Sequence, residues 1–244
     1  MNNSNNNVCI ITGGGSGIGR STAVLFAKLG ATAIIVDVDD SAGQETVRMA
    51  NECGGSSVFF HADISQEQDV SRLKDEVIAR YSCINTLVNN AAIMRFSKVV
   101  DLSVEDWDAV MAVNIRGTFL MCKHFIPLIK KGSIINVSSV HSRSTAANVS
   151  AYAASKGAVE SFSRALSIEC EAIDVRVNCV IPGSVDTKML WDNPNLKSGD
   201  EVVSGKIASP EDIAEIIYFI SSDKAKAVTG SSIVVDNGLL SRLG

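Results

Sequence analysis

Ser139, Tyr152 and Lys156 are the residues whose types and spacing could best support chemistry. Tyr152 and Lys156 are four positions apart, which places both on one face of a helix, about one turn apart. A phenol titrates near pH ~10, and a lysine charge within about 4 to 6 Å typically lowers such a pKa by roughly 1 to 3 units. Tyr152 could then exchange a proton with an alcohol or carbonyl oxygen held by the Ser139 hydroxyl. A chance Tyr/Lys pair on a helix is an equally acceptable interpretation of these three residues alone.

Two neighbouring segments would position these side chains. Residues 134–137, Ile-Ile-Asn-Val, are apolar and indicate a buried strand that ends just before Ser139. The alanine-rich run 151–165 indicates a helix that carries Tyr152 and Lys156. A hydroxyl, a phenol and an ammonium group can therefore converge on one point.

A glycine-rich turn near the N-terminus indicates a phosphate site. Residues 8–12 predict a short strand, the next seven read Gly-Gly-Gly-Ser-Gly-Ile-Gly, and an apolar helical pattern follows. Such a strand, turn and helix point backbone N–H groups and a helix N-terminus at a phosphate, and the missing Cβ atoms let a pyrophosphate approach. The spacing Gly13, Gly17, Gly19 differs from the literal G-x-G-x-x-G fingerprint, so a tight turn without a ligand is the alternative.

A Walker-type phosphate loop is a competing interpretation of the same turn. Residues 14–21 read G-x-x-x-x-G-R-S, with Arg20 where that loop requires lysine. Arginine is not equivalent to lysine at such a site, because its planar guanidinium differs from a compact ammonium charge. We therefore favour a dinucleotide over a nucleoside triphosphate.

Asp37 predicts which dinucleotide binds. It ends the predicted strand 33–36 and lies 18 residues after Gly19, close to the spacing at which an acidic residue accepts hydrogen bonds from the adenosine ribose. Its carboxylate would repel a 2′-phosphate, and no Lys or Arg lies among residues 13–19 or 38–40. The sequence therefore predicts NAD rather than NADP.

Strand and helix patterns continue to alternate along the chain. Residues 58–60 predict a strand, Val70, Leu73, Val77 and Ile78 fit one helical face, and residues 84–88 predict the next strand. Alternation of this kind indicates a doubly wound parallel sheet of the Rossmann type, with helices on both faces. We expect one α/β domain over residues 1–244, with residues 1–7 as a flexible lead-in.

Composition narrows the class of protein further. The 244 residues carry a net charge of −5, which gives no basic field for a nucleic acid. No apolar run approaches the ~20 residues of a membrane span, and the start MNNSNNN lacks the features of a secretory signal. Six scattered cysteines without a CxxC pair indicate reduced thiols and no metal site. We expect a cytoplasmic protein with a small-molecule substrate.

Across residues 12–238 the chain resembles the short-chain dehydrogenase/reductase family, in its shorter NAD(P)-dependent branch. The resemblance rests on motifs that occur in the family's order and spacing: Thr12-Gly13-x-x-x-Gly17-x-Gly19, Asn89-Asn90-Ala91, Asn114, Ser139 before Tyr152-x-x-x-Lys156, Asn178, Pro182-Gly183, Thr187, Thr229-Gly230 and Val235-Asp236. Each motif is weak alone, but together they make a chance Tyr/Lys pair a minor alternative.

The resemblance implies roles for the chemically active residues. Tyr152 would be the acid/base, Lys156 its electrostatic partner and a donor to the nicotinamide ribose, and Ser139 the clamp on the substrate oxygen. Asn114 would hold a water that relays the proton from Lys156 to solvent. The residues expected at the cofactor are Gly13, Ser16, Gly17, Ile18, Gly19, Asp37, Asp63, Ile64, Asn89, Ala91, Tyr152, Lys156, Pro182, Gly183, Val185 and Thr187.

The substrate is less well specified. His141, Arg143, Arg95 and Trp191 are the candidate substrate contacts, although the two arginines can equally be solvated loop charges. Residues 188–207 are expected to form a short lid, richer in Asp, Asn, Gly and Ser than in apolar residues, which argues against a large lipid. Two departures from the family pattern are Ala92 and Asn237, each at a usual glycine position.

These observations predict an oxidoreductase that transfers a hydride between NAD(H) and a small or medium secondary alcohol or ketone. Two alternatives stay open: a 3-oxoacyl-thioester reductase, which normally calls for NADPH, and a regulator that binds NAD without turnover. From the resemblance we also expect a homotetramer, joined through long helices such as those containing Trp107 and Tyr152.

Overall fold

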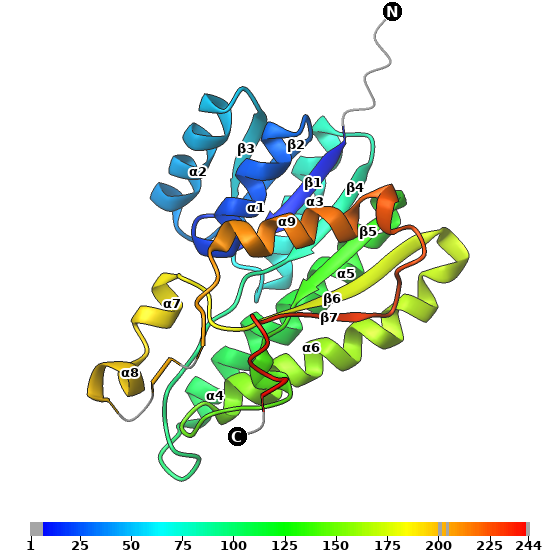
Figure 1. The fold of residues 1–244 in the computed structure, drawn as a ribbon. Coiled ribbons are helices and arrows are strands. Elements are labelled where there is room, and N and C mark those ends of the chain that lie inside the picture. The colour runs from blue at the N-terminus through cyan, green and yellow to red at the C-terminus, as the bar shows by residue number, and fades with distance from the viewer. Residues whose placement is uncertain (1–6, 200–201, 204, 243–244) are drawn as a thin grey trace, which may run out of the picture.

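The computed structural model describes residues 7–199, 202–203 and 205–242, and in these ranges a seven-stranded parallel sheet forms the centre of the molecule (Figure 1). The strand order is β3-β2-β1-β4-β5-β6-β7, and all neighbouring strands are parallel. The strands are β1 Val8–Thr12, β2 Thr32–Asp37, β3 Ser56–His61, β4 Ile84–Asn89, β5 Ile129–Val137, β6 Val175–Pro182 and β7 Ser232–Val235.

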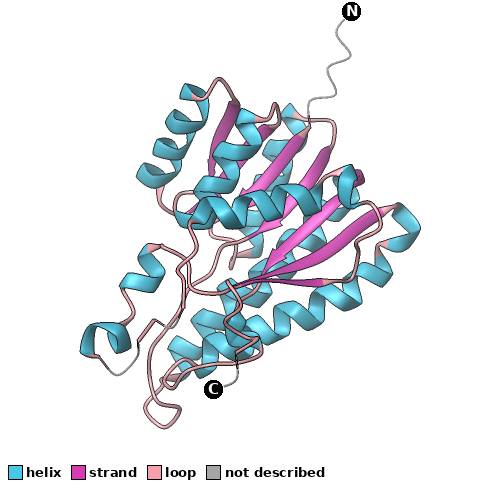
Figure 2. Cartoon of the chain, viewed as in Figure 1, coloured by secondary structure: helices cyan, strands magenta, loops and turns pink. Residues whose placement is uncertain are grey.

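Helices connect the strands and cover both faces of the sheet (Figure 2). The α-helices are α1 Gly17–Lys28, α2 Asp40–Glu52, α3 Glu67–Arg80, α4 Val104–Met111, α5 Thr118–Phe125, α6 Ser150–Glu169, α7 Lys188–Trp191, α8 Pro194–Ser198 and α9 Pro210–Ser221. The shorter helical turns are the π-helix η1 Ala112–Gly117 and the 3-10 helices η2 Ile126–Leu128, η3 Val140–Ser142, η4 Glu171–Ile173 and η5 Asp223–Ala225.

Alternate residues of each strand supply the two sides of the core. In β1, Ile10 packs with α3, α5 and α6, whereas Cys9 and Ile11 pack with α1, α2 and α9. Because both faces are covered, the strands are nearly continuous apolar runs, as parallel sheets require. The predicted doubly wound α/β architecture is confirmed.

Successive strands are added to opposite sides of the sheet before and after β4, and the switch point between β1 and β4 positions the site. The first three strands extend from β1 to the edge at β3, after which the chain crosses back to β4 on the other side of β1. Ligands of such sheets bind beyond the carboxyl ends of the strands, where neighbouring loops diverge.

The structure describes only part of the expected N-terminal lead-in, residues 1–7, and of the expected lid, residues 188–207. Residues 1–6, which belong to the expected lead-in, lie outside the described residues, whereas the Asn7 carbonyl already accepts a hydrogen bond from Thr32 N at 2.7 Å. Asn7 is therefore already bonded to the sheet, although strand β1 begins at Val8 as predicted. Within the predicted lid, residues 200, 201 and 204 lie outside the described residues.

Candidate active site

Helix α6 and the end of strand β5 bring Tyr152 and Lys156 together. Both side chains are buried, with relative exposures of 6% and 2%, and Lys156 Nζ lies 5.6 Å from the centroid of the Tyr152 ring. Lys156 Nζ donates a hydrogen bond to the Val137 carbonyl oxygen at 2.7 Å, and the Ser138 hydroxyl donates to the Lys156 carbonyl oxygen at 2.8 Å. The strand end therefore holds this lysine through both its side chain and its backbone.

Burial controls the protonation of this pair. It raises the pKa of Tyr152 to about 12, against a smaller lowering by a hydrogen bond from Ser139. It also lowers the pKa of Lys156 to about 8, which a nearby thiol, Cys179, opposes. The expectation that Lys156 lowers the phenol pKa is therefore wrong for the chain by itself, because desolvation outweighs the charge effect. The phenol is neutral at pH 7, which is the form that can donate a proton to a carbonyl oxygen.

Ser139 and His141 flank the phenol. The Ser139 oxygen accepts a hydrogen bond from His141 N at 3.2 Å, in the short turn η3. The His141 ring packs edge to face with Tyr152, with centroids 5.7 Å apart at 79°, and its Nδ1 lies 2.9 Å from Thr145 Oγ1. Of the four sequence candidates for substrate contact, His141 is the one that the structure brings to the cleft beside Tyr152.

Asn114 lies in the π-helical turn η1, behind the cleft surface. Its Oδ1 accepts from Ile93 N at 2.8 Å, and its Nδ2 donates to Ile93 O and to Ser155 Oγ, both at 2.9 Å. The side chain therefore fastens the segment after β4 to helix α6, next to Lys156. The water relay expected of Asn114 stays a prediction.

A cleft of about 870 Å³ opens beyond the carboxyl ends of the strands. It is lined by most of the residues expected at the cofactor: Gly13, Ser16, Gly17, Ile18, Asp37, Asp63, Ile64, Ala91, Tyr152, Lys156, Pro182, Gly183, Val185 and Thr187. Gly19 and Asn89 are not among the lining residues. A Cβ on Gly19 would lie 2.1 Å from the Gly13 carbonyl oxygen, and Asn89 Nδ2 donates to Asn136 Oδ1 at 2.8 Å, so both residues support the cleft from behind.

The glycine turn fits the pyrophosphate of a dinucleotide. Gly13 and Gly17 have φ angles of 62° and 49°, and a Cβ on Gly13 would lie 2.8 Å from Ala91 Cα. The turn is fastened to β4 by Asn90, whose Nδ2 donates to the Thr12 and Gly13 carbonyl oxygens at 3.0 and 3.2 Å. Helix α1 begins at Gly17, so its N-terminus and bare backbone face the cleft, as phosphate binding requires.

Asp37 lies at the end of β2, on the cleft wall next to this turn. Its Oδ2 accepts a hydrogen bond from Gly15 N at 2.8 Å, and its Oδ1 accepts from Val38 N and Asp39 N at 2.8 and 3.1 Å. Three backbone donors thus hold the carboxylate in place on the cleft wall.

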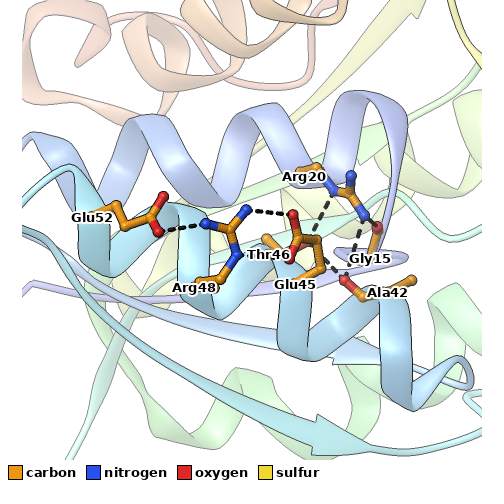
Figure 3. A network of polar contacts seen from close by, with 7 residues as sticks. All are labelled: Gly15, Arg20, Ala42, Glu45, Thr46, Arg48 and Glu52. Carbon is orange, nitrogen blue, oxygen red and sulfur yellow. Dashed lines mark hydrogen bonds and ion pairs between the residues drawn. The ribbon is translucent and has the colours of Figure 1, made fainter.

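Arg20 is turned away from the cleft. Its guanidinium donates to the Gly15 carbonyl oxygen and, at 3.1 Å, to the Thr46 hydroxyl on helix α2 (Figure 3). On the same helix Arg48 pairs with Glu45 and Glu52. Arg20 does not line the cleft, so the Walker-type interpretation, in which this position carries the phosphate-binding cation, finds no geometric support.

The other half of the cleft is mostly apolar. It is lined by Met94, Val140, His141, Ser144, Thr145, Ala146, Met189, Leu190, Asn193, Val202, Val203, Leu239, Leu240 and Arg242. Polar lid residues pair with one another instead: Lys197 contacts Asp192 at 3.2 Å, and the Asn193 side chain accepts from Asn195 N at 2.9 Å. The composition of the lid is therefore a poor guide to the surface that it presents to a substrate.

Three sequence candidates for substrate contact lie outside the cleft lining. Arg95 pairs with Asp106 at 3.0 Å, and Arg143 pairs with Glu160 at 3.0 Å. Trp191 Nε1 donates to Asp186 Oδ1 at 2.7 Å, and its side chain is exposed. Their polar groups are occupied there, which corrects the expectation that they face the substrate.

Sequence reasoning named Asn90 within the Asn89-Asn90-Ala91 motif, but not its bonds to the glycine turn. It missed Ser138 and the residues after β7, because their roles depend on contacts between distant segments. The C-terminal Leu239, Leu240 and Arg242 follow β7, whose carboxyl end lies at the same edge of the sheet. Recognising residues 232–235 as a further parallel strand would have pointed to them.

The described residues contain no helix long and apolar enough to cross a membrane. They also contain no cluster of three His, Cys, Asp or Glu side chains suited to a metal ion.

Comparison with known proteins places the chain in a family. The model of a family described as enoyl-(acyl carrier protein) reductase matches residues 13–240. Cyclopentanol dehydrogenase of Comamonas testosteroni is 35% identical over 246 residues, 98% of each chain. The 3-oxoacyl-[acyl-carrier-protein] reductase FabG of Thermotoga maritima is 35% identical over 240 residues, covering 96% of this chain and 97% of the relative.

Solved structures agree with these relatives. The crystal structure of levodione reductase superposes with a TM-score of 0.91 at 27% identity, covering 98% of this chain and 99% of that one. A structure from Burkholderia xenovorans, described as a short-chain dehydrogenase/reductase, also has a TM-score of 0.91, at 32% identity and 98% coverage of both chains. The chain therefore belongs to the short-chain dehydrogenase/reductase family of oxidoreductases, which use a nicotinamide cofactor.

Proposed function

We propose that this protein is an NAD-dependent dehydrogenase that interconverts a secondary alcohol and its ketone. The observation that carries the proposal is the neutral, buried phenol of Tyr152, hydrogen-bonded to Ser139 and packed beside Lys156 in the cleft. A phenol of this kind can protonate a carbonyl oxygen while the Ser139 hydroxyl donates a second hydrogen bond to it. The nicotinamide cofactor supplies or accepts the hydride.

The chain's own residues would position the reactants and move the proton. Ser139 orients the substrate oxygen toward Tyr152, and Lys156, held at the Val137 carbonyl oxygen, stabilises the phenolate left after proton transfer. In the direction of alcohol oxidation the same phenolate takes the hydroxyl proton. Asn114 fixes α6 against the segment after β4, and we retain the proposal that it lies on the proton path to solvent.

NAD rather than NADP is the proposed cofactor. Support comes from the Asp37 carboxylate on the cleft wall and from Arg20, the nearest cation of the turn, which is bound to Gly15 and Thr46. A 2′-phosphate beside Asp37 would meet a like charge, which at about 4 Å costs on the order of 4 kcal/mol at an effective dielectric constant near 20.

A cyclic or compact secondary alcohol is the proposed substrate class. The apolar half of the cleft supports it, as does the name of the relative cyclopentanol dehydrogenase. A 3-oxoacyl-thioester reductase is the second candidate, because the Thermotoga relative of that name is equally identical. Asp37 disfavours it, since that activity normally calls for NADPH.

A homotetramer is the proposed assembly. Apolar side chains on α4, α5 and α6 are exposed in the single chain, among them Val104, Trp107, Phe119 and Ile168. Exposed apolar surface of this kind is typical of contacts between subunits. Light scattering should give about four times the 25.8 kDa of one chain, and Ile168→Asp should lower that mass.

The decisive experiment offers the purified protein a panel of secondary alcohols and ketones with NAD(H) and NADP(H), followed by NADH absorbance. Tyr152→Phe should lower turnover by about 10²- to 10⁴-fold while NAD binding, measured by calorimetry, changes little. Tyr218→Phe is the matched control, because that ring packs on Phe26 in helix α1, outside the cleft lining. NAD binding without turnover on any candidate would favour the regulator, and full activity of Tyr152→Phe would refute the assignment.

A further inference from the structure

The C-terminal turn forms a wall of the apolar half of the cleft. After β7 the Asp236 carboxylate accepts hydrogen bonds from Gly238 N at 2.8 Å and Leu240 N at 2.7 Å, which folds the chain back. Leu239 and Leu240 then pack against the cluster that contains Val140, the neighbour of Ser139. Leu239 and Leu240 are thereby held close to the reacting centre.

A second set of contacts joins this turn to the lid. Asn237, with φ of 52°, donates from Nδ2 to the Lys206 carbonyl oxygen at 3.2 Å. The Arg242 guanidinium lies against Gly205, where a Cβ would be only 2.8 Å from Nη1. The arginine therefore occupies a place that the glycine leaves open, between the C-terminal turn and the lid.

Arg242 differs from the other arginines considered for the site. It lines the cleft, and it forms no salt bridge with any residue in the described ranges, whereas Arg95 and Arg143 are ion-paired outside the cleft. An arginine that lines a cleft without a carboxylate partner is available to bind an anion.

Among the described lining residues, the acidic side chains and Arg242 lie at opposite ends of the cleft. The carboxylates among the described lining residues are Asp37 and Asp63, beyond β2 and β3, whereas Arg242 follows β7 at the opposite edge of the sheet. Lys156 is bound to Val137, and Lys188 follows Thr187, which lies against Gly17 of the phosphate turn. Lys188 begins α7, next to Met189 and Leu190, whereas Arg242 is the cation on the side of the apolar half formed by Leu239 and Leu240.

We propose that Arg242 binds a carboxylate of the substrate, so that the enzyme prefers apolar secondary alcohols or ketones carrying an acidic group remote from the reacting carbon. This inference rests on the proposed function and narrows its substrate class. The apolar body of the substrate contacts Leu239 and Leu240, and the guanidinium fork receives the carboxylate at the mouth between turn and lid.

Two matched ketones test the proposal in the full-length protein with NADH: 3-oxocyclohexane-1-carboxylate and the neutral 3-methylcyclohexan-1-one. The wild type should have a kcat/KM at least about tenfold higher for the acid. Arg242→Gln should remove this preference by raising KM for the acid about tenfold, with kcat and the neutral ketone little changed. Arg242→Lys, which keeps the charge but loses the fork, should fall between them.

Arg143→Gln is the matched control, because it removes a charge that pairs with Glu160 outside the cleft lining, and it should retain the preference for the acid. Equal use of both ketones by the wild type, or an equal loss on both in Arg242→Gln, would overturn the proposal. A raised KM for NADH without a change for the acid would also overturn it, by assigning the arginine to the cofactor.

A calorimetric experiment separates this inference from the proposed function. If no ketone is turned over, the proposed function fails, but binding of cyclohexanecarboxylate to the NAD-loaded protein can still be measured. Binding to the wild type that weakens about tenfold in Arg242→Gln and persists in Arg143→Gln would support the carboxylate site. Absence of that binding in the wild type would refute it.

Discussion

The Lys156 ammonium group donates a hydrogen bond to the Val137 carbonyl oxygen at 2.7 Å. This contact joins helix α6 to the end of strand β5 within the reacting centre, and the Ser138 hydroxyl reinforces it from the next residue. The position of the ammonium group relative to the Tyr152 ring is therefore set by the sheet as well as by the i, i+4 spacing on the helix.

The buried phenol predicts that alcohol oxidation depends on pH more steeply than ketone reduction does. Because the pKa of Tyr152 is raised to about 12, the phenolate needed for alcohol oxidation is scarce at pH 7 and becomes more abundant as the pH rises. We expect kcat/KM for oxidation to rise by up to about tenfold per pH unit between pH 7 and 10, with ketone reduction much flatter. Steady-state pH profiles in both directions measure this, and a flat oxidation profile would contradict it.

The buried lysine predicts a pH-dependent cost in stability. Its pKa is about 8 in the folded chain and 10.5 unfolded, so between these values the unfolded chain binds more protons and stability rises with pH. The shift of about 2.5 units corresponds to roughly 3 kcal/mol. At pH 7 the wild type carries this cost and Lys156→Met does not. The unfolding free energy of Lys156→Met, relative to that of wild type, should therefore fall by roughly 3 kcal/mol between pH 7 and 10.5.

Denaturant unfolding at several pH values measures this difference. Lys156→Met also loses the bond to Val137, which changes its unfolding free energy at every pH. The test is therefore how the difference from wild type changes with pH, and not its sign at pH 7. Lys130→Met, which replaces an exposed lysine of strand β5, should show no such trend. A constant difference for Lys156→Met across the range would rule out a depressed lysine pKa.

Asp37 predicts the cofactor preference. Asp37→Ser removes the charge that would repel a 2′-phosphate, so kcat/KM with NADP should rise and that with NAD should fall about tenfold or more. The loss of the bond from Gly15 N should add to the loss with NAD. Asp40→Asn is the control, because Asp40 pairs with His61 outside the cleft lining. A wild type that already prefers NADP would contradict the proposal.

The Ser138 hydrogen bond to the Lys156 carbonyl is expected to support turnover as well as stability. Ser138→Ala should cost about 1 kcal/mol of unfolding free energy, because the buried Lys156 carbonyl loses its side-chain donor, and should lower kcat more than KM. Ser163→Ala removes a buried bond on helix α6, from Ser163 Oγ to Val159 O at 2.7 Å, and also the bond that Ser163 Oγ accepts from Asn136 Nδ2 at 2.8 Å. It should lose at least as much stability while kcat stays near that of wild type; equal kcat in both variants would show that Ser138 is structural only.

The sequence was sufficient for the fold and the chemical centre, because both depend on local patterns. The strand predicted over residues 8–12 has the same bounds as β1, and the helix predicted over residues 151–165 lies within α6. Alternating strands and helices restrict the topology to parallel crossovers, which bring the polar strand ends to one edge.

The features that sequence could not predict depend on contacts between distant segments. Arg95 and Arg143 are visible as charges, but their partners Asp106 and Glu160 lie 11 and 17 residues away and place them outside the cleft. The raised pKa of Tyr152 follows from how deeply α6 is buried, which no spacing reveals. Arg242 required knowledge that the residues after β7 fold back over the cleft.

The parallel sheet also decides where a purification tag can be attached. All seven strands run the same way (Figure 1). Strand β1 therefore starts at Val8 on the edge of the sheet opposite the cleft, whereas Arg242 forms part of the cleft wall. An affinity tag fused after residue 244 would follow Arg242 of the cleft wall by two residues. A tag fused ahead of Met1 would precede β1, which starts at the opposite edge of the sheet, and is the arrangement suited to every assay described above.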